Sequence, residues 1–453
     1  MKKTLFLRVG SMVVLFLFTL LLWPVQAQEI CWNINPTPLP TPTGTWHCTV
    51  VHSGKIYIIG GTNLTHYAEK VFFANINPDG TVGSWSETTP LPEPRAGNAL
   101  VWNNFVYVIG GYGPTWEGRG QQNTVFYASI NADGTIGEWG TTKTLPERTS
   151  DFASVVKDGR IYVMGGYNGF TYRDEVYFAP INSDGSLGDW QTTTPLPQRY
   201  CGMSGLAYRG TVYVIGGIHA YDQSLRWVYK ASINQDGTLG NWQEAPPLPE
   251  ARSYAGVALS GENVYVVGGQ GPMGTGDFHK TVYRANIQIL DWMEIFESLP
   301  EQRQSHSLVT FQGRLYVIGG DASIVDGHPV RRDTIYYSST PTVPAIVDID
   351  PDTLNLKSNG QWITAYISLL EAYSVEDIVP DTVCLAGIPA AWSEIQDSVY
   401  MGKFDRATVQ TSVADEPDYD SAPKFYDLLL VVTGELVDGT PFEGSDTITV
   451  LKK

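Results

Sequence analysis

Six glycine doublets divide most of this chain of 453 residues into units of 50 to 55 residues. A run of four apolar, β-branched or aromatic residues precedes each doublet, as in 56–59, and is typical of a strand buried on both faces. The doublets begin at Gly60, Gly110, Gly165, Gly216, Gly268 and Gly319. Since a repeat of this length cannot bury its own apolar face, the units are expected to pack against one another.

Each unit continues with a second strand, a tight turn and a tryptophan. The turn contains Asp-Gly in the first four units, which is a strong hairpin signal. Leu-Pro follows each tryptophan, and an apolar strand then leads to the next doublet. Four short strands per unit predict one blade of a β-propeller, and therefore an all-β fold. The tryptophans are Trp85, Trp139, Trp190, Trp242 and Trp292.

The order Gly-Gly, Tyr or Phe, then Trp in each unit resembles the kelch repeat. The resemblance extends over residues 31–340 and implies a six-bladed kelch-like propeller, which we assign to residues 28–340. The sixth unit has no tryptophan after its doublet, whereas Trp32 stands before the first doublet. We therefore expect an N-terminal strand to complete the last blade and to close the ring, which leaves no open edge.

The chain begins with the pattern of a secretory signal. Lys2, Lys3 and Arg8 precede an apolar run over 12–23, and Ala27 is a small residue at a plausible cleavage point. The run is too short to cross a bilayer, which takes about 20 apolar residues. We predict a signal peptide over residues 1–27 and a secreted or cell-surface protein without a stable membrane span. A retained anchor is the alternative.

Residues 341–453 lose the repeat but keep β-rich runs, so we predict a small immunoglobulin-like β-sandwich after the propeller. Parts of this segment resemble a module appended to secreted bacterial surface proteins. Most of the net charge of −18 belongs to this acidic module. The acidic balance argues against a nucleic-acid partner, because neutralising phosphates takes clustered Lys and Arg. Four scattered cysteines are too few for a disulfide framework.

Two groups of residues are candidates for ligand binding. The loops after the doublets differ in every unit, which is typical of functional loops on a repeated scaffold. Aromatic rings beside polar groups suit a glycan or a protein epitope, while packing of the loops against themselves is the alternative. The loop candidates are Trp116, Tyr167, Tyr172, Tyr221 and Asp222.

The second group is an arginine that follows Leu-Pro in five units, with Thr43 in its place in the first. A ring of guanidinium groups at the channel mouth would bind carboxylates bidentately. Alternatively, each arginine ties its own blade to the next by hydrogen bonds to carbonyl groups. The arginines are Arg95, Arg148, Arg199, Arg252 and Arg303.

No catalytic residue, metal ligand or cofactor site is predicted. His47 and His306 each lie 13 residues before a doublet and look like parts of the repeat, and the sequence from Gly269 to Gly274 opens no helix. A binding module for a glycan or protein partner is therefore our first hypothesis. The resemblance also implies an alternative, a carbohydrate-active enzyme such as a sialic acid mutarotase-like epimerase, because kelch-like propellers include a six-bladed sialic acid mutarotase. They also include copper radical oxidases, but those have seven blades and a cysteine–tyrosine cross-link that this sequence does not indicate. A structural matrix protein is the third possibility.

Overall fold

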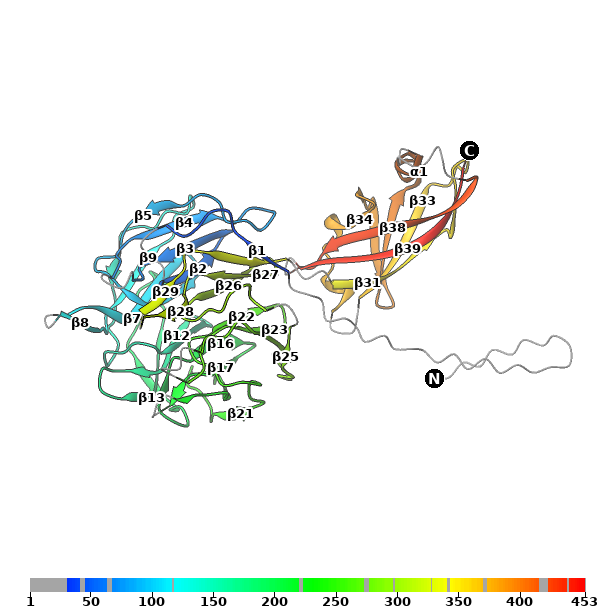
Figure 1. The fold of residues 1–453 in the computed structure, drawn as a ribbon. Coiled ribbons are helices and arrows are strands. Elements are labelled where there is room, and N and C mark those ends of the chain that lie inside the picture. The colour runs from blue at the N-terminus through cyan, green and yellow to red at the C-terminus, as the bar shows by residue number, and fades with distance from the viewer. Residues whose placement is uncertain are drawn as a thin grey trace, which may run out of the picture.

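The computed structural model describes residues 31–40, 45–62, 67–115, 118–219, 223–272, 277–295, 298–326, 328–339, 343–369, 373–414, 423–437 and 440–452. Figure 1 shows two bodies, a ring of β-sheets and a smaller C-terminal module. The predicted signal peptide lies outside the described residues. None of the helices in the described ranges is long and apolar enough to cross a membrane.

The ring is a propeller of six antiparallel sheets, counted over the described residues. Five have four strands, and the second has a fifth strand, β8 (Gly118–Gln121), paired with β7. The innermost strands β2, β6, β11, β16, β22 and β26 contact one another in sequence around the axis. The all-β propeller fold predicted from the repeat is confirmed.

The first blade consists of β2 (Cys48–His52), β3 (Lys55–Ile59), β4 (Val71–Asn75) and β5 (Ser86–Thr88). The second consists of β6 (Ala96–Trp102), β7 (Phe105–Thr115), β9 (Val125–Ser129) and β10 (Gly140–Thr141). The third consists of β11 (Ala153–Lys157), β12 (Arg160–Tyr167), β13 (Tyr172–Pro180) and β14 (Gln191–Thr193).

The fourth blade consists of β16 (Ser204–Tyr208), β17 (Thr211–Ile215), β20 (Val228–Ser232) and β21 (Gln243–Ala245). The fifth consists of β22 (Gly256–Ser260), β23 (Asn263–Val267), β24 (Val282–Asn286) and β25 (Met293–Glu294). The sixth consists of β26 (Ser307–Phe311), β27 (Arg314–Ile318), β30 (Ile335–Ser338) and β1 (Trp32–Ile34). Two smaller sheets pair β15 (Tyr200–Cys201) with β18 (Ile218–His219) and β19 (Gln223–Ser224), and β28 (Asp321–Val325) with β29 (His328–Arg331).

The outermost strand of the sixth blade comes from the N-terminal part of the chain. β1 pairs antiparallel with β30, with Trp32 opposite Ser338. Just beyond β1, the buried Asn35 accepts a hydrogen bond from the Val82 amide at 2.7 Å and donates to the Val82 carbonyl at 3.1 Å. The sixth blade is therefore joined both to the N-terminal strand and, through Asn35, to the first blade.

The repeated aromatic residues join neighbouring blades. Tyr57 on β3 donates its hydroxyl to the Gly134 carbonyl in the turn of the next blade at 3.0 Å, and Tyr107, Tyr162 and Tyr316 make equivalent bonds. The five tryptophans donate their indole N–H groups to carbonyls 46 to 50 residues earlier, at 2.9 to 3.1 Å. The contacts between blades therefore recur with the same spacing as the repeat in the sequence.

The glycine doublets are required by the backbone. The first glycine of each doublet has a φ of 46° to 67°, a left-handed conformation that favours glycine. A Cβ on Gly216 would overlap the carbonyl oxygen of Arg252, and a Cβ on Gly268 would overlap that of Arg303. The obstacle is thus the main chain of the connection that enters the next blade.

The C-terminal module holds strands β31 (Val343–Asp350), β32 (Thr353–Asn355), β33 (Trp362–Leu369), β34 (Cys384–Leu385), β35 (Ile388–Pro389), β36 (Trp392–Gln396), β37 (Val399–Asp405), β38 (Phe425–Glu435) and β39 (Pro441–Leu451), the helix α1 (Arg406–Ala414), and two 3-10 helices, η1 (Val375–Asp377) and η2 (Pro380–Thr382). β31 pairs parallel with β39 and antiparallel with β33, so eight of the nine strands in the described ranges form one continuous path, and β32 pairs with β39 off that path. An immunoglobulin-like arrangement of this module remains a prediction.

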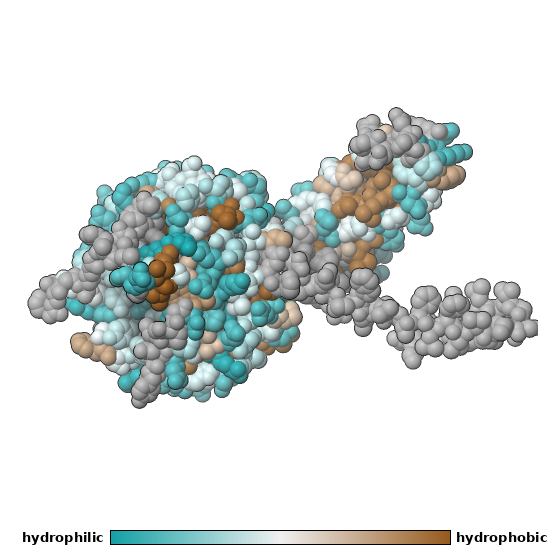
Figure 2. Space-filling model, viewed as in Figure 1, coloured by the Kyte–Doolittle hydropathy of each residue, from teal (hydrophilic) through white to brown (hydrophobic). Residues whose placement is uncertain are grey.

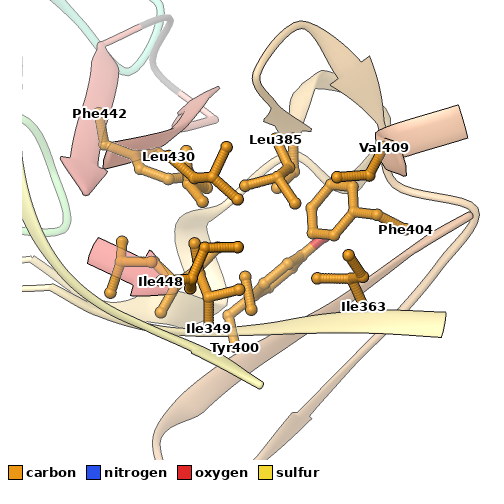
Figure 3. Packing of buried hydrophobic residues seen from close by; sticks show 14 of the residues in the cluster. Ile349, Ile363, Leu385, Tyr400, Phe404, Val409, Leu430, Phe442 and Ile448 are labelled. Atoms are coloured by element: carbon orange, nitrogen blue, oxygen red, sulfur yellow. The ribbon is translucent and has the colours of Figure 1, made fainter. Parts of the chain in front are cut away.

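One hydrophobic core fills the C-terminal module, and Figure 3 shows side chains from opposite strands meeting in it. Ile363, Leu385 and Phe404 are fully buried there. Helix α1, which the sequence analysis did not predict, adds Val409 and Val413, spaced one turn apart. Figure 2 shows that apolar residues also gather on the surface of this module, whereas much of the propeller face in view is hydrophilic.

Candidate functional site: the mouth of the central channel

A cavity of about 200 Å³ lies where the six innermost strands begin. Residues from every blade line it, and Tyr112 adds a ring from beyond the second doublet. The lining residues are Trp46, His47, Ala96, Gly97, Asn98, Tyr112, Ser150, Asp151, Phe152, Gly202, Met203, Ser204, Tyr254, Ala255, Ser305, His306 and Ser307. Since all six blades contribute, the cavity is the mouth of the central channel, on the side of the loops after the doublets.

One position of the repeat supplies the most distinctive side chains. Trp46, Asp151 and Tyr254 each stand 14 residues before a doublet and have φ of 52°, 54° and 51°. This left-handed conformation is uncommon for residues other than glycine and costs about 1 kcal/mol or more. Gly202 and Ser305 hold the same repeat position with φ of 64° and 50°, so the backbone conformation recurs in five blades while the side chain differs between them.

Aromatic rings form part of the cavity wall. The rings of Trp46 and Tyr112 stack with their centroids 6.0 Å apart and an angle of 16° between their planes. Trp46 is 39% exposed, so part of its ring is available to a ligand. The Tyr254 ring lies against Gly202, where a Cβ would come within 3.0 to 3.2 Å of the ring atoms. The glycine therefore makes room for the tyrosine.

Asp151 is the carboxylate of the cavity wall. Its Oδ2 accepts a hydrogen bond from the Ser150 hydroxyl at 2.8 Å. Burial raises the pKa of Asp151 to about 6, against the opposing effect of that hydrogen bond. Burial also raises the pKa values of Tyr112 and Tyr254, and the Asp151 charge adds to both shifts. One carboxylate thus shares the mouth with two phenol groups.

The two histidines of the cavity wall are neutral at pH 7. Burial lowers the pKa of His47 to about 4 and that of His306 to about 3. His47 Nδ1 lies 3.0 Å from the Thr49 hydroxyl, and His306 Nε2 packs beside Gly256, where no side chain would fit. No group of three metal-ligating side chains occurs in the described ranges. The described cavity wall contains no lysine or arginine.

The five predicted arginines do not form a ring at the channel mouth. Arg95, Arg252 and Arg303 are 0% to 1% exposed, whereas Arg148 and Arg199 are exposed. The carbonyl of each buried arginine accepts a hydrogen bond from the second glycine of the preceding doublet, as between Gly217 and Arg252 at 3.0 Å. We expected the five arginines to occupy equivalent positions in a ring, and this was wrong. In the connections that enter the third and fourth blades, the arginine follows the leucine of Leu-Pro by three residues and not by four.

Thr149 and Tyr200 take the buried position in those two blades. The Gly111 amide donates to the Thr149 carbonyl at 2.9 Å, and the Tyr200 carbonyl lies beside Gly165. Both residues are buried. Arg199 instead pairs with Asp174 at the surface, at 3.3 Å. The arginines that follow Leu-Pro therefore form two structural groups, three that are buried and two that are exposed.

Each buried arginine ties two blades together. The Arg252 carbonyl bonds to the fourth blade, while its guanidinium lies 4.4 Å from the ring centroid of Tyr283 in the fifth. Its Nη2 also contacts Glu250 at 3.3 Å and Thr281 at 3.0 Å. Arg95 stacks on Phe126 and Arg303 on Tyr336 in the same manner. These contacts support the structural alternative for three of the five arginines.

The predicted loop aromatics are only partly described. Tyr167 and Tyr172 form an edge-to-face pair with centroids 5.7 Å apart, and the Tyr167 hydroxyl donates to the Gly169 carbonyl at 2.8 Å. Neither residue lines the cavity. Trp116, Tyr221 and Asp222 lie outside the described residues.

Sequence reasoning missed Trp46, Asp151 and Tyr254, although a signal was available. With the units aligned on their doublets, the position 14 residues earlier reads Trp, Ala, Asp, Gly, Tyr and Ser. A position that differs in every unit, directly before a strand that recurs in all of them, has the variability expected of a ligand site. The loops after the doublets vary in length as well as in sequence, and therefore gave the stronger signal of variability.

Comparisons with known proteins agree with the propeller. The KLHDC2/KLHL20/DRC7 Kelch-repeats domain matches residues 18–217. The Kelch-like protein terF of Aspergillus terreus is 25% identical over 262 residues, which cover 53% of this chain and 54% of the fungal protein. Kelch-like protein 36 of Rattus norvegicus is 24% identical over 247 residues, 52% of this chain and 37% of the rat protein. The chain thus spans about half or less of the length of these relatives.

Among solved structures, that of YjhT is similar, with a TM-score of 0.54 and 15% sequence identity. The match covers 70% of this chain and 97% of YjhT. At this identity the likeness shows the fold alone. Together with the kelch-repeat match, it shows that this chain is similar to kelch-repeat proteins and that its ring has the all-β kelch propeller fold.

Proposed function

We propose that this protein is a binding module whose propeller holds a carbohydrate at the mouth of the central channel. The observation that carries this proposal is the cavity in which Trp46, Tyr112 and Tyr254 stand beside hydrogen-bonding side chains. Aromatic faces pack against the C–H face of a sugar, and polar groups at the rim bind its hydroxyls. Asn98, Ser150 and further serines supply such groups.

The size of the cavity favours a small ligand. Its volume of about 200 Å³ is below the range of about 300 to 1,000 Å³ typical of drug-sized pockets. A single sugar ring fits that scale, whereas a stable protein interface takes about 800 Å² per partner. A protein partner that inserts one side chain into the channel is the alternative.

The proposal includes export. A signal peptide over residues 1–27 would place the mature protein outside the cytoplasm. N-terminal sequencing of the protein recovered from the medium or cell surface is expected to begin at Gln28. A protein that starts at Met1 in that fraction would contradict cleavage.

A second function, anomerisation of a sugar, is favoured by one observation. Asp151 is a half-buried carboxyl with a pKa of about 6 at the channel mouth, which suits a general acid or base near neutral pH. The acidic sugar weighed in the sequence analysis is not favoured, because the three buried arginines pack between blades and none lines the described cavity wall. NMR exchange spectroscopy of neutral sugars tests this activity.

Carbohydrate binding is tested by saturation-transfer NMR of the full chain with neutral monosaccharides, followed by a glycan array. Trp46→Ala is expected to weaken binding about tenfold or more, because the ring loses its stacking contact. Trp392→Ala is the matched control, since Trp392 is 42% exposed but lies on the C-terminal module. Failure of every sugar to bind, or equal binding by Trp46→Ala, would contradict the proposal.

A further inference from the structure

The described wall of the channel mouth is uneven in charge. It contains one carboxylate, Asp151, and neither lysine nor arginine. The two imidazoles that line the same cavity are uncharged at pH 7, since burial lowers their pKa values. Within the described ranges, no ion pair includes Asp151, and its side chain accepts a hydrogen bond from the neutral Ser150 hydroxyl. A half-buried negative charge therefore lacks a cationic side chain from the described part of the protein.

Aromatic residues share the cavity wall with this carboxylate, whose charge adds to the effect of burial in raising the pKa values of Tyr112 and Tyr254. Trp46, Tyr112, Phe152 and Tyr254 line the same cavity, and the first two are stacked on each other. The face of an aromatic ring carries partial negative charge and attracts cations, most strongly when the ring is tryptophan. Clusters of aromatic rings bind quaternary ammonium groups in proteins, and a carboxylate in the same cavity adds a charge of the opposite sign.

We propose that the channel mouth binds an ammonium group, with Asp151 as its counter-ion and the Trp46, Tyr112 and Tyr254 rings as its walls. This inference rests on the proposed carbohydrate function and narrows the ligand to a sugar that carries a free amine. The sequence predicted a positively charged mouth that binds an anion, whereas the described wall carries one carboxylate and suits a cation.

An ammonium ligand would also compensate for the cost of placing a carboxylate at this position. Burial of Asp151 costs stability unless a cation compensates for the lost hydration. An ammonium ligand supplies that compensation, and its N–H groups match the acceptors of Asp151 and Asn98. The titratable and polar groups that share the cavity with this charge are Ser150 on its own connection, Tyr112, Tyr254, and the neutral His47 and His306.

The test compares glucosamine with glucose, which differ at one amine, by calorimetric titration of the full chain at pH 7.5. Glucosamine is expected to bind at least tenfold more tightly than glucose, and tetramethylammonium is expected to compete with it. Asp151→Asn is expected to abolish the preference. Asp158→Asn is the matched control, because Asp158 is in the same blade with a φ of 50° but lies between β11 and β12, away from the cavity.

The outcomes separate this inference from the proposed function. Equal binding of the two sugars overturns the ammonium inference and leaves carbohydrate binding standing. Binding of tetramethylammonium alone, lost in Asp151→Asn, supports the ammonium site and overturns the carbohydrate function. If neither sugar nor tetramethylammonium binds to the folded wild-type chain, both fail. Unchanged binding in Asp151→Asn also overturns the role of the carboxylate.

Discussion

At the scale of single residues, Asp151 shows how function is set against stability. Its burial disfavours the ionised form, and its left-handed backbone is uncommon for a residue other than glycine. The equivalent position in the fourth blade, Gly202, has a φ of 64° and no side chain to desolvate. The carboxylate is therefore not needed to make the turn, which supports its assignment to ligand binding.

Replacing Asp151 by Asn is expected to stabilise the protein in a pH-dependent manner. Because burial raises the pKa from 3.8 to about 6, the folded state holds the proton more tightly than the unfolded state. Stability is therefore lost as the pH rises through that window, and the variant gains about 1 to 3 kcal/mol above pH 6 but nothing below pH 4. Urea unfolding at pH 8 and pH 3.5 measures this gain, and an equal gain at both values would contradict it.

At the scale of elements, the connections between blades matter as much as the strands. Each buried arginine bonds through its carbonyl to one blade and stacks through its guanidinium on the next. Where the arginine is shifted by one residue, a threonine or tyrosine fills the position instead. The connections thus repeat the same backbone geometry from blade to blade with different side chains.

Arg252→Ala is expected to destabilise the propeller by about 2 to 4 kcal/mol, because Glu250, Thr281 and Tyr283 lose a buried partner. Arg199→Ala is the comparison, since its side chain is 60% exposed and its pair with Asp174 is at the surface. That change is expected to cost about 0.5 kcal/mol or less. Equal costs in chemical unfolding would show that the two arginines have the same role.

At the scale of the whole molecule, the ring is closed by residues more than 300 apart in the chain, as between Trp32 and Ser338. The closing strand β1 is short, yet it completes the sixth blade and leads into the Asn35 bond to the first. The channel mouth exists only in the closed ring, because every blade contributes to it. Closure therefore affects stability and the candidate site together.

Deletion of residues 28–36 is expected to lower the melting temperature of the propeller by about 10 °C or more, since the sixth blade loses its outer strand and Val82 its buried partner. Scanning calorimetry of the full chain and the deletion measures the shift. Ile34→Ala is the control, because Ile34 is 61% exposed and its strand pairing does not depend on the side chain. An unchanged transition in the deletion would refute the closure by β1.

The sequence by itself determined the period, the blade count and the all-β class, because the glycines, tyrosines and tryptophans of each unit make contacts that recur with the same spacing. It did not determine helix α1, whose nine residues show little amphipathic pattern and are held by the core of the C-terminal module. It also misplaced the arginines, because a shift of one residue in a connection moves a side chain from a blade interface to the surface. Only the tertiary structure brought Trp46, Asp151 and Tyr254 together, since residues about 100 apart in the chain meet where the six inner strands surround the axis.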